Sequence, residues 1–415
     1  MANPSTNKAV KTPKNRKTKK SLGLYVHIPF CRSKCAYCDF CSYTGVDSKI
    51  VDHYINSLIL QAEDFSIQCR GYCVDSIYFG GGTPSMLTSK QLTRILDCII
   101  RLYNVHKNAE ITVEVNPATV NGDYLRKLKN AGVNRLSIGM QSANDNELKK
   151  LGRIHTYDDF EKTYNAARYV GFENINVDVM YGIPDQTKES FSNTLDKVIA
   201  LEPEHISLYA LKLEEGTPMY KMQDKLTFPS DDEQFEMYCE AVRRLKKSNI
   251  EPYEISNFSL DGYESIHNIK YWLGDEYIGL GVAAHSYFQG ERFEATKNIK
   301  TYVYAMELVK KKIPIFVSYE KIQKEEAAKE FFMLGMRLYE GIERSEFEEK
   351  FGAELAAKYL EPLNDYVEDG YVKIANGIYA FTEKGMFVSS YILSDIFETV
   401  EADGNSSSES NYDED

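Results

Sequence analysis

Short apolar stretches alternate with longer amphipathic stretches through the first half of the chain. Six apolar runs of strand length lie at about residues 23–28, 74–79, 110–115, 134–138, 174–179 and 204–209. Most of these runs are separated by segments in which apolar residues recur at helical spacing, for example residues 50–65, 90–102 and 157–170. This alternation predicts an α/β fold with a parallel sheet and right-handed crossovers. Because there are six units rather than eight, we expect a partial, open (β/α)6 barrel over residues 21–215.

The pattern changes from about residue 216 onward. Residues 216–315 mix aromatic and polar clusters, which predicts a mixed α/β extension of the barrel. The pattern over residues 316–397 predicts a small helical, winged-helix-like domain. Its expected helices lie near 323–339, 344–350 and 354–368, followed by a strand pair around 372–381 and a last helix. The ends are strongly charged, and we expect a disordered basic tail over residues 1–20 and a disordered acidic tail over 398–415.

The amino-acid composition excludes several classes of protein. The chain has 415 residues and 43% hydrophobic content, which agrees with a folded protein of two or three packed units. No apolar run reaches the roughly 20 residues of a membrane span, and the N-terminal segment has no apolar core of a signal peptide, so we expect a cytoplasmic location. Eight cysteines suit a reducing compartment. The net charge of −13 argues against a nucleic-acid partner.

Polar and glycine-rich segments follow the predicted strands at their carboxyl ends. In a barrel of parallel strands these ends face one mouth, where binding residues gather. The segments are the run 31–38 after the first strand, the run 80–84 after the second, and Glu114, Gln141, Asp178 and Tyr209 at the following four.

The run after the first strand carries the motif Cys31-x3-Cys35-x2-Cys38. Each iron of a four-iron cluster needs a terminal ligand, so three thiolates leave one iron open to an exchangeable molecule. The alternatives are a zinc site with His27 as a fourth ligand, or reduced structural thiols. Zinc knuckles usually pair such a motif with a second ligand pair further along the chain, and no such pair follows here.

The other strand-end residues suit a ligand beside this motif. The run Gly80-Gly-Gly-Thr-Pro84 removes side chains, so that backbone N–H groups can approach a ligand. Glu114 and Asp178 would be costly to bury without partners, and an amine and ribose hydroxyls would satisfy them. Arg153 offers a planar fork for a carboxylate; its alternative is an ordinary ion pair at a helix end.

The cysteine motif and its flanks resemble the radical S-adenosylmethionine (SAM) superfamily, in which SAM chelates the open iron. Over about residues 23–395, the order and spacing of these segments resemble the oxygen-independent coproporphyrinogen III oxidase group. The resemblance implies a [4Fe-4S] cluster on the three cysteines. It also implies a SAM-binding set of Tyr25, Gly81, Gly82, Thr83, Glu114, Gln141, Arg153 and Asp178.

Two branches of that group are distinguished by the residue two places after the motif. Oxidases resemble CxxxCxxCxC, whereas this chain has Phe40 at the last position, as in the heme chaperone branch, and Cys41 follows one residue late. The run 267–272 matches the HNxxYW pattern of that branch, which implies heme binding by His267 and Tyr271. The alternative is a histidine that caps a turn, with aromatics in the core.

The resemblance therefore implies a chaperone that binds heme and transfers it to an acceptor protein, which could be membrane-associated. Its cofactors would be a [4Fe-4S] cluster, SAM and heme, and a flavodoxin or ferredoxin is the expected electron donor. No side chain is assigned as catalytic, because the cofactor would carry any radical chemistry. The main alternative is an enzyme that decarboxylates coproporphyrinogen III, and a radical SAM enzyme for another substrate stays open, as does a homodimer.

Overall fold

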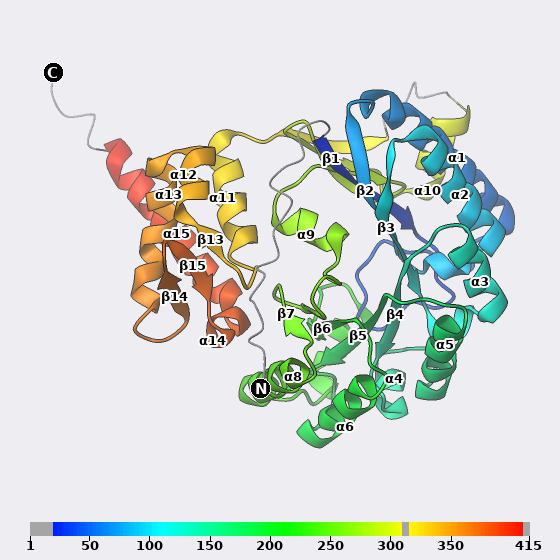
Figure 1. Cartoon of the computed structure of the whole chain (residues 1–415), viewed down its shortest axis with the longest axis horizontal. Coiled ribbons are helices and arrows are strands. Elements are labelled where there is room, and N and C mark those ends of the chain that lie inside the picture. Colours follow the sequence, from blue (N-terminus) through cyan, green and yellow to red (C-terminus); the bar gives the residue numbers. More distant parts are fainter. Residues whose placement is uncertain (1–19, 309–314, 410–415) are drawn as a thin grey trace, which may run out of the picture.

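The structure, a computed structural model, describes residues 20–308 and 315–409 (Figure 1). Of the two predicted tails, residues 1–19 and 410–415 lie outside this part of the chain. In the described residues, no helix is long and apolar enough to span a membrane.

Six parallel strands form the centre of the molecule, in the order in which they occur along the chain. Buried apolar residues recur at alternate positions along these strands, and several polar residues between them are buried as well, such as His27, Arg135 and Asn176. This arrangement confirms the predicted open (β/α) barrel. The strands are β1 (Lys20–Ile28), β2 (Tyr72–Gly81), β3 (Val105–Val115), β4 (Arg135–Gln141), β5 (Ile175–Tyr181) and β6 (His205–Ala210).

Helices cover the outer face of these strands (Figure 1). Capping boxes fix the first turns of several helices: Thr88 and Gln91 bond each other's backbone N–H groups at the start of α2, and Ser230 and Glu233 do so at α8. The helices of this half are α1 (Ser48–Gln68), α2 (Ser89–Leu102), α3 (Gly122–Asn130), α4 (Asp145–Lys150), α5 (Tyr157–Tyr169), α6 (Lys188–Ile199), α7 (Pro218–Lys221) and α8 (Asp231–Lys247), with short 3-10 turns at Pro84–Met86, Pro117–Thr119 and Gln223–Lys225.

The extension adds strands to both edges of the same sheet, which becomes twelve-stranded. The strand β9 pairs in parallel with β1 and continues into an antiparallel group, while β8 pairs with β6 at the other edge. These strands have two to six residues, too short for a clear alternating pattern. They are β7 (Glu251–Pro252), β8 (Asn257–Ser259), β9 (Tyr277–Leu280), β10 (His285–Phe288), β11 (Glu291–Ala295) and β12 (Phe316–Lys321), with α9 (Ile266–Trp272), α10 (Ile299–Val303) and a π-helical turn (Tyr304–Leu308) between them.

The boundary at residue 316 differs from the structure. The strand β12 pairs with β11 and so belongs to the main sheet, not to the C-terminal domain. Five of its six residues are exposed, as on an edge strand, so it lacks the apolar face that would have revealed it.

The C-terminal domain has its own apolar core of helices around a three-stranded sheet. The single helix expected over 354–368 is two elements, because Pro362 starts a 3-10 turn after Leu360. The last helix runs beyond 397, with Val400 buried in the core and Glu401 bonded to Lys329. The elements are α11 (Lys324–Gly335), β13 (Ile342–Glu343), α12 (Arg344–Phe351), α13 (Ala353–Leu360), a 3-10 turn (Glu361–Tyr366), β14 (Val372–Ala375), β15 (Ile378–Phe381), α14 (Glu383–Phe387) and α15 (Ser389–Glu409).

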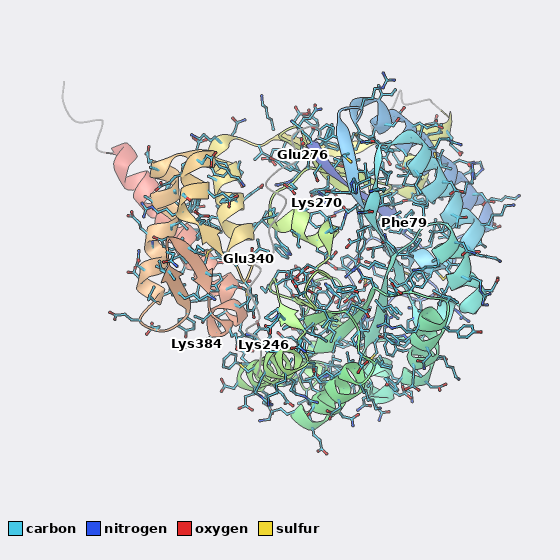
Figure 2. All side chains as sticks on the ribbon, viewed as in Figure 1. Phe79, Lys246, Lys270, Glu276, Glu340 and Lys384 are labelled. Carbon is cyan, nitrogen blue, oxygen red and sulfur yellow. The ribbon has the colours of Figure 1, made fainter. Side chains whose placement is uncertain are left out.

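This domain packs against α8 and the loop beyond β7. Lys246 lies at the end of α8 where α14 approaches, and it forms an ion pair with Glu383 (Figure 2). The hydroxyls of Tyr238 and Tyr339 are 2.7 Å apart, and the backbone N–H of Tyr339 donates to the carbonyl of Tyr253. These contacts hold the domain against α8 and the loop beyond β7.

Candidate functional site

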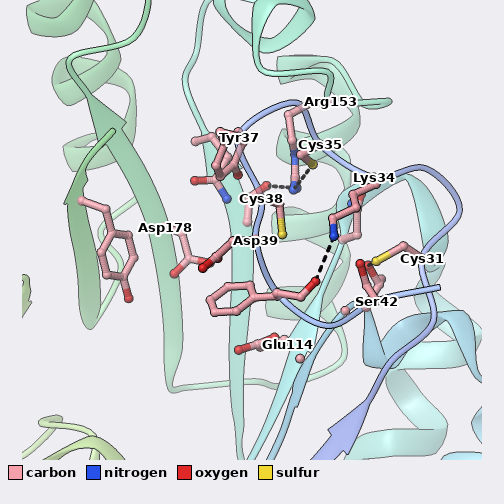
Figure 3. A pocket seen from close by; sticks show the side chains of 18 of the residues that line it. Cys31, Lys34, Cys35, Tyr37, Cys38, Asp39, Ser42, Glu114, Arg153 and Asp178 are labelled. Atoms are coloured by element: carbon pink, nitrogen blue, oxygen red, sulfur yellow. Dashed lines mark hydrogen bonds between the residues drawn. The ribbon is translucent and has the colours of Figure 1, made fainter. Parts of the chain in front are cut away.

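A cavity of about 420 Å³ opens at the carboxyl ends of the barrel strands. Its lining comes from the loops and ends of all six strands, and every lining residue lies between Cys31 and Glu214. Cys31, Cys35 and Cys38 all line it, and Figure 3 shows their side chains around the same space as Glu114 and Asp178. We call this space the cluster cavity. The predicted convergence of strand-end residues at one mouth is therefore present.

The three cysteines of the motif are free, partly exposed thiols. The sulfur of Cys31 lies 3.7 Å from the hydroxyl of Thr83, and the sulfur of Cys35 accepts a contact of 3.7 Å from Arg153. Burial raises the pKa of the Cys38 thiol to about 11. Because iron binds the thiolate, binding at Cys38 must displace a proton.

The glycine run lies against the first strand and the cysteine loop. Gly81 has a φ of +113°, and a Cβ there would lie 2.5 Å from the His27 ring. A Cβ on Gly82 would lie 3.0 Å from the sulfur of Cys31. Glycine therefore keeps this wall thin next to the first cysteine, as a closely approaching ligand requires.

Two acids face the cavity from strands β3 and β5, which lie on either side of β4. Glu114 accepts a hydrogen bond of 3.0 Å from the hydroxyl of Tyr78, and Asp178 accepts one of 2.7 Å from the amide of Asn176. Burial, reinforced by the nearby Asp178, raises the pKa of Glu114 to about 8. Burial also raises the pKa of Asp178. Such a pair favours a ligand that brings positive charge and hydroxyl groups.

Arg153 does not form the surface ion pair that was its alternative interpretation. One of its terminal nitrogens donates to the carbonyl of Gly139 at 2.9 Å, and the other points at Cys35. Its Nε is buried and has no hydrogen-bond partner among the described residues. An unpaired buried N–H group beside the cavity fits an anionic group of a ligand.

The donor set fits an iron–sulfur cluster better than a zinc ion held by His27. Both ring nitrogens of His27 already have partners, the Tyr25 hydroxyl at 3.1 Å and the Cys41 carbonyl at 2.9 Å. In the described part of the chain, no three His, Cys, Asp or Glu side chains converge closely enough to hold one metal ion. Three thiols spread around a cavity suit a larger cluster with one open iron, and the two acids and Arg153 suit an amino acid ligand on that iron.

Most of the predicted SAM-binding residues share the cluster cavity, but Tyr25 does not. It lines a neighbouring cavity of about 710 Å³, together with Tyr271. We call this second space the tyrosine cavity. It includes Lys34, Asp39, Phe40 and Ser42, which also line the cluster cavity, so the segment 39–42 separates the two spaces. The residues found in the cluster cavity are Gly81, Gly82, Thr83, Glu114, Gln141, Arg153 and Asp178.

His267 lines neither of these cavities. It is 1% exposed on α9, and its ring nitrogens lie 2.9 Å from the Ser76 hydroxyl and 3.0 Å from the Tyr271 hydroxyl. Glu110 accepts hydrogen bonds from the first backbone N–H groups of α9 and fixes that helix. In this geometry the His267 ring is hydrogen-bonded to the Tyr271 hydroxyl and so positions the Tyr271 side chain.

Sequence reasoning missed the polar residues that hold the acids. Tyr78 bonds Glu114, while Asn176 and Ser137 bond Asp178. The available signal was a polar residue at alternate positions of an otherwise apolar strand, since residues two apart share a face. Asn176 and Asp178 follow this pattern within β5.

Family models match two parts of the chain. Residues 25–198 match the radical SAM superfamily, and residues 322–388 match the HemN C-terminal domain. The heme chaperone HemW of Bacillus subtilis is 34% identical over 372 residues, which cover 89% of this chain and 97% of that protein. The chain belongs to the HemW family. HemW of Escherichia coli is 32% identical over 89% of this chain and 97% of that protein.

The chain also shares its fold with an enzyme of solved structure. Coproporphyrinogen III oxidase (HemN) from Escherichia coli matches 91% of this chain and 90% of its own with a TM-score of 0.79, at 24% sequence identity. At that identity the likeness describes the fold only. Membership of the radical SAM superfamily implies a [4Fe-4S] cluster and SAM, which agrees with the residues of the cluster cavity.

The pKa of Glu114 predicts a pH dependence of the cofactor-free protein. The carboxyl ionises near pH 4.5 when unfolded and near pH 8 when folded. Its contribution to the free energy of unfolding is therefore lost as the pH rises through this range, by at most ~1.4 kcal/mol per pH unit. We expect urea unfolding of Glu114→Gln from pH 5 to 8 to show a smaller decline than that of the wild type. An equal decline in both proteins would refute the assignment.

Proposed function

We propose that this chain binds heme and delivers it to an acceptor protein, with a [4Fe-4S] cluster and SAM in the cluster cavity. Its relationship to HemW proteins over 97% of their length carries the proposal. A large cavity lined by aromatic rings lies directly beside the cluster cavity and supports it. Cavities of several hundred Å³ with apolar walls and a few polar groups are typical of cofactor sites.

In this proposal three irons of the cluster would each be bound by one thiolate, from Cys31, Cys35 and Cys38. SAM would bind the fourth iron. Glu114 and Asp178 bind the amine and ribose of SAM, and the buried Nε of Arg153 faces its anionic part. The thin wall at Gly81 and Gly82, with Thr83 and Gln141, shapes the space. When reduced, such a cluster supplies an electron that can cleave SAM to a radical. The chain's own residues position the ligand and exclude water.

Heme is proposed to occupy the tyrosine cavity. Tyr25, Tyr271 and Tyr277 line it, and the rings of the latter two pack edge to face at 4.6 Å. Such rings offer flat apolar surface to a porphyrin. Direct binding of iron by His267 stays a prediction; it would require the histidine to leave its bonds to Ser76 and Tyr271. In the proposal His267 positions Tyr271.

The chaperone function is favoured over coproporphyrinogen oxidation by one side chain. Phe40 stands where the oxidases carry a further cysteine, and 64% of its surface is exposed. It lies between the two cavities, so it adds an apolar surface for a flat ligand there. The acceptor would be a protein, for example a membrane-associated one, and a flavodoxin or ferredoxin would reduce the cluster.

Titration with heme tests this function. The full-length chain, anaerobically loaded with cluster and SAM, is mixed with increasing heme and passed through a desalting column. We expect a Soret band that remains with the protein and saturates at about one heme per chain. A band that is washed away, or that grows without saturation, would contradict a specific heme site.

A further inference from the structure

We infer that His285, not His267, supplies the axial ligand to heme iron in the tyrosine cavity. The inference rests on the proposed heme-binding function and assigns its ligand. Heme iron in proteins is bound by an imidazole, a thiolate, a thioether or a phenolate. The tyrosine cavity contains two histidines, His27 and His285, one cysteine, Cys41, and four tyrosines. The hydroxyls of Tyr25, Tyr43 and Tyr271 already bond His27, the Lys297 carbonyl and His267.

His27 has no free nitrogen for iron. The residue is 5% exposed, and its ring bonds the Tyr25 hydroxyl with one nitrogen and the Cys41 carbonyl with the other. A Cβ at Gly81 would lie within 3 Å of three ring atoms, which shows how closely the backbone holds this ring. Releasing the ring would leave buried polar groups unpaired, which is unfavourable.

His285 has the opposite environment. It is the first residue of β10, its side chain is 55% exposed, and no hydrogen bond to its ring is present among the described residues. Its nearest charged neighbour is Glu294 on β11, whose carboxylate oxygen lies 3.6 Å from the ring Nε2. His285 can therefore bind iron without giving up a bond within the protein.

Glu294 provides a second, independent feature of this site. The same oxygen, Oε1, is buried and has no hydrogen-bond partner among the described residues, although Lys297 is 3.3 Å away. Histidines that bind metals usually donate their second ring N–H to a carboxylate, which fixes the ring and strengthens the ligand. Register pairs His285 with Glu294 across β10 and β11, so the acid is placed for this role.

Other residues of the tyrosine cavity suit the porphyrin ring and the propionate groups of heme. Aromatic rings line it, as described above, and Phe40 extends this apolar surface into solvent. Lys34 and Lys297 line the same space and can pair with the two propionate groups. Cys41 is the alternative ligand, since its sulfur makes only contacts of 3.7 Å and 4.0 Å to Lys297 and Tyr43.

Heme binding to single-residue variants tests the assignment. The full-length protein, loaded with its cluster, is titrated with ferric heme in the wild-type form and as His285→Ala, His267→Ala and Cys41→Ala. His53→Ala, an exposed histidine on α1, is the matched control. We expect His285→Ala to weaken heme binding by at least about tenfold and to lose the absorption and paramagnetic resonance signature of histidine ligation. Added imidazole should restore that signature.

The other variants separate the alternatives. His267→Ala should retain a histidine-ligated spectrum, because the residue acts through Tyr271. Loss of that spectrum in His267→Ala, with a wild-type spectrum in His285→Ala, would overturn the inference and favour the HNxxYW histidine. A thiolate spectrum that disappears in Cys41→Ala would overturn it in favour of the cysteine. A wild-type protein that binds no heme would refute the proposed function as well.

Discussion

Replacing Cys31, Cys35 or Cys38 by alanine is expected to abolish the iron–sulfur cluster, whereas Cys41→Ala is expected to keep it. All three cysteines of the motif line the cluster cavity, and each would hold one iron. Two remaining thiolates cannot anchor a four-iron cluster that already has one open site. The sulfur of Cys41 belongs to the tyrosine cavity, where its neighbours are the Lys297 carbonyl and the Tyr43 hydroxyl.

The measurement is iron and sulfide content after anaerobic reconstitution, with the visible absorption of the cluster. We expect about four irons and four sulfides per chain in the wild type and in Cys41→Ala. The three other variants should contain little of either. Loss of the cluster in Cys41→Ala alone would show that the ligand set is wrong, and it would favour the oxidase.

Removing Glu114 or Asp178, the two acids that line the cluster cavity from its strands, is expected to weaken SAM binding while iron content stays unchanged. Glu114 and Asp178 are the carboxylates placed to accept hydrogen bonds from the amine and ribose of SAM. Each charge-assisted bond to a buried ligand contributes roughly 1.5–3 kcal/mol. The alanine variants should therefore bind SAM about tenfold more weakly or worse.

Isothermal titration under anaerobic conditions measures this affinity, and the change in the paramagnetic resonance of the reduced cluster reports contact with the iron. Asp97→Ala is the control, because Asp97 is an exposed acid on α2. Unchanged affinity in both Glu114→Ala and Asp178→Ala would show that these strand ends do not bind SAM.

Local sequence carried enough information for the barrel and the cluster cavity. Each of the six strands contains buried apolar residues at alternate positions, and parallel strands bring the residues at their carboxyl ends to one mouth of the barrel. The positions of Glu114 and Asp178 follow from that geometry without any contact being known. The cysteine spacing lies within eight residues, so it is also a local signal.

The tyrosine cavity could not be derived in this way. Its walls come from segments about 250 residues apart, near Tyr25 and near Tyr271, and they meet because β9 pairs in parallel with β1. A four-residue strand gives no signal of that pairing. The burial of His267 depends on Ser76 from β2, a partner that sequence spacing does not reveal. The sequence motif therefore pointed at both His267 and Tyr271, and of these two the structure brings Tyr271 to the cavity.

A protein that transfers heme and does not make its precursor should retain heme and leave coproporphyrinogen III unchanged. To test this, the full-length protein is loaded with its cluster and reduced under anaerobic conditions. One sample is incubated with coproporphyrinogen III and SAM, and decarboxylated porphyrin is quantified. A parallel sample is loaded with heme, and its Soret band is recorded. We expect no decarboxylated product and a stable Soret band of about one heme per chain. Formation of protoporphyrinogen IX with consumption of SAM, in a protein that retains no heme, would contradict it.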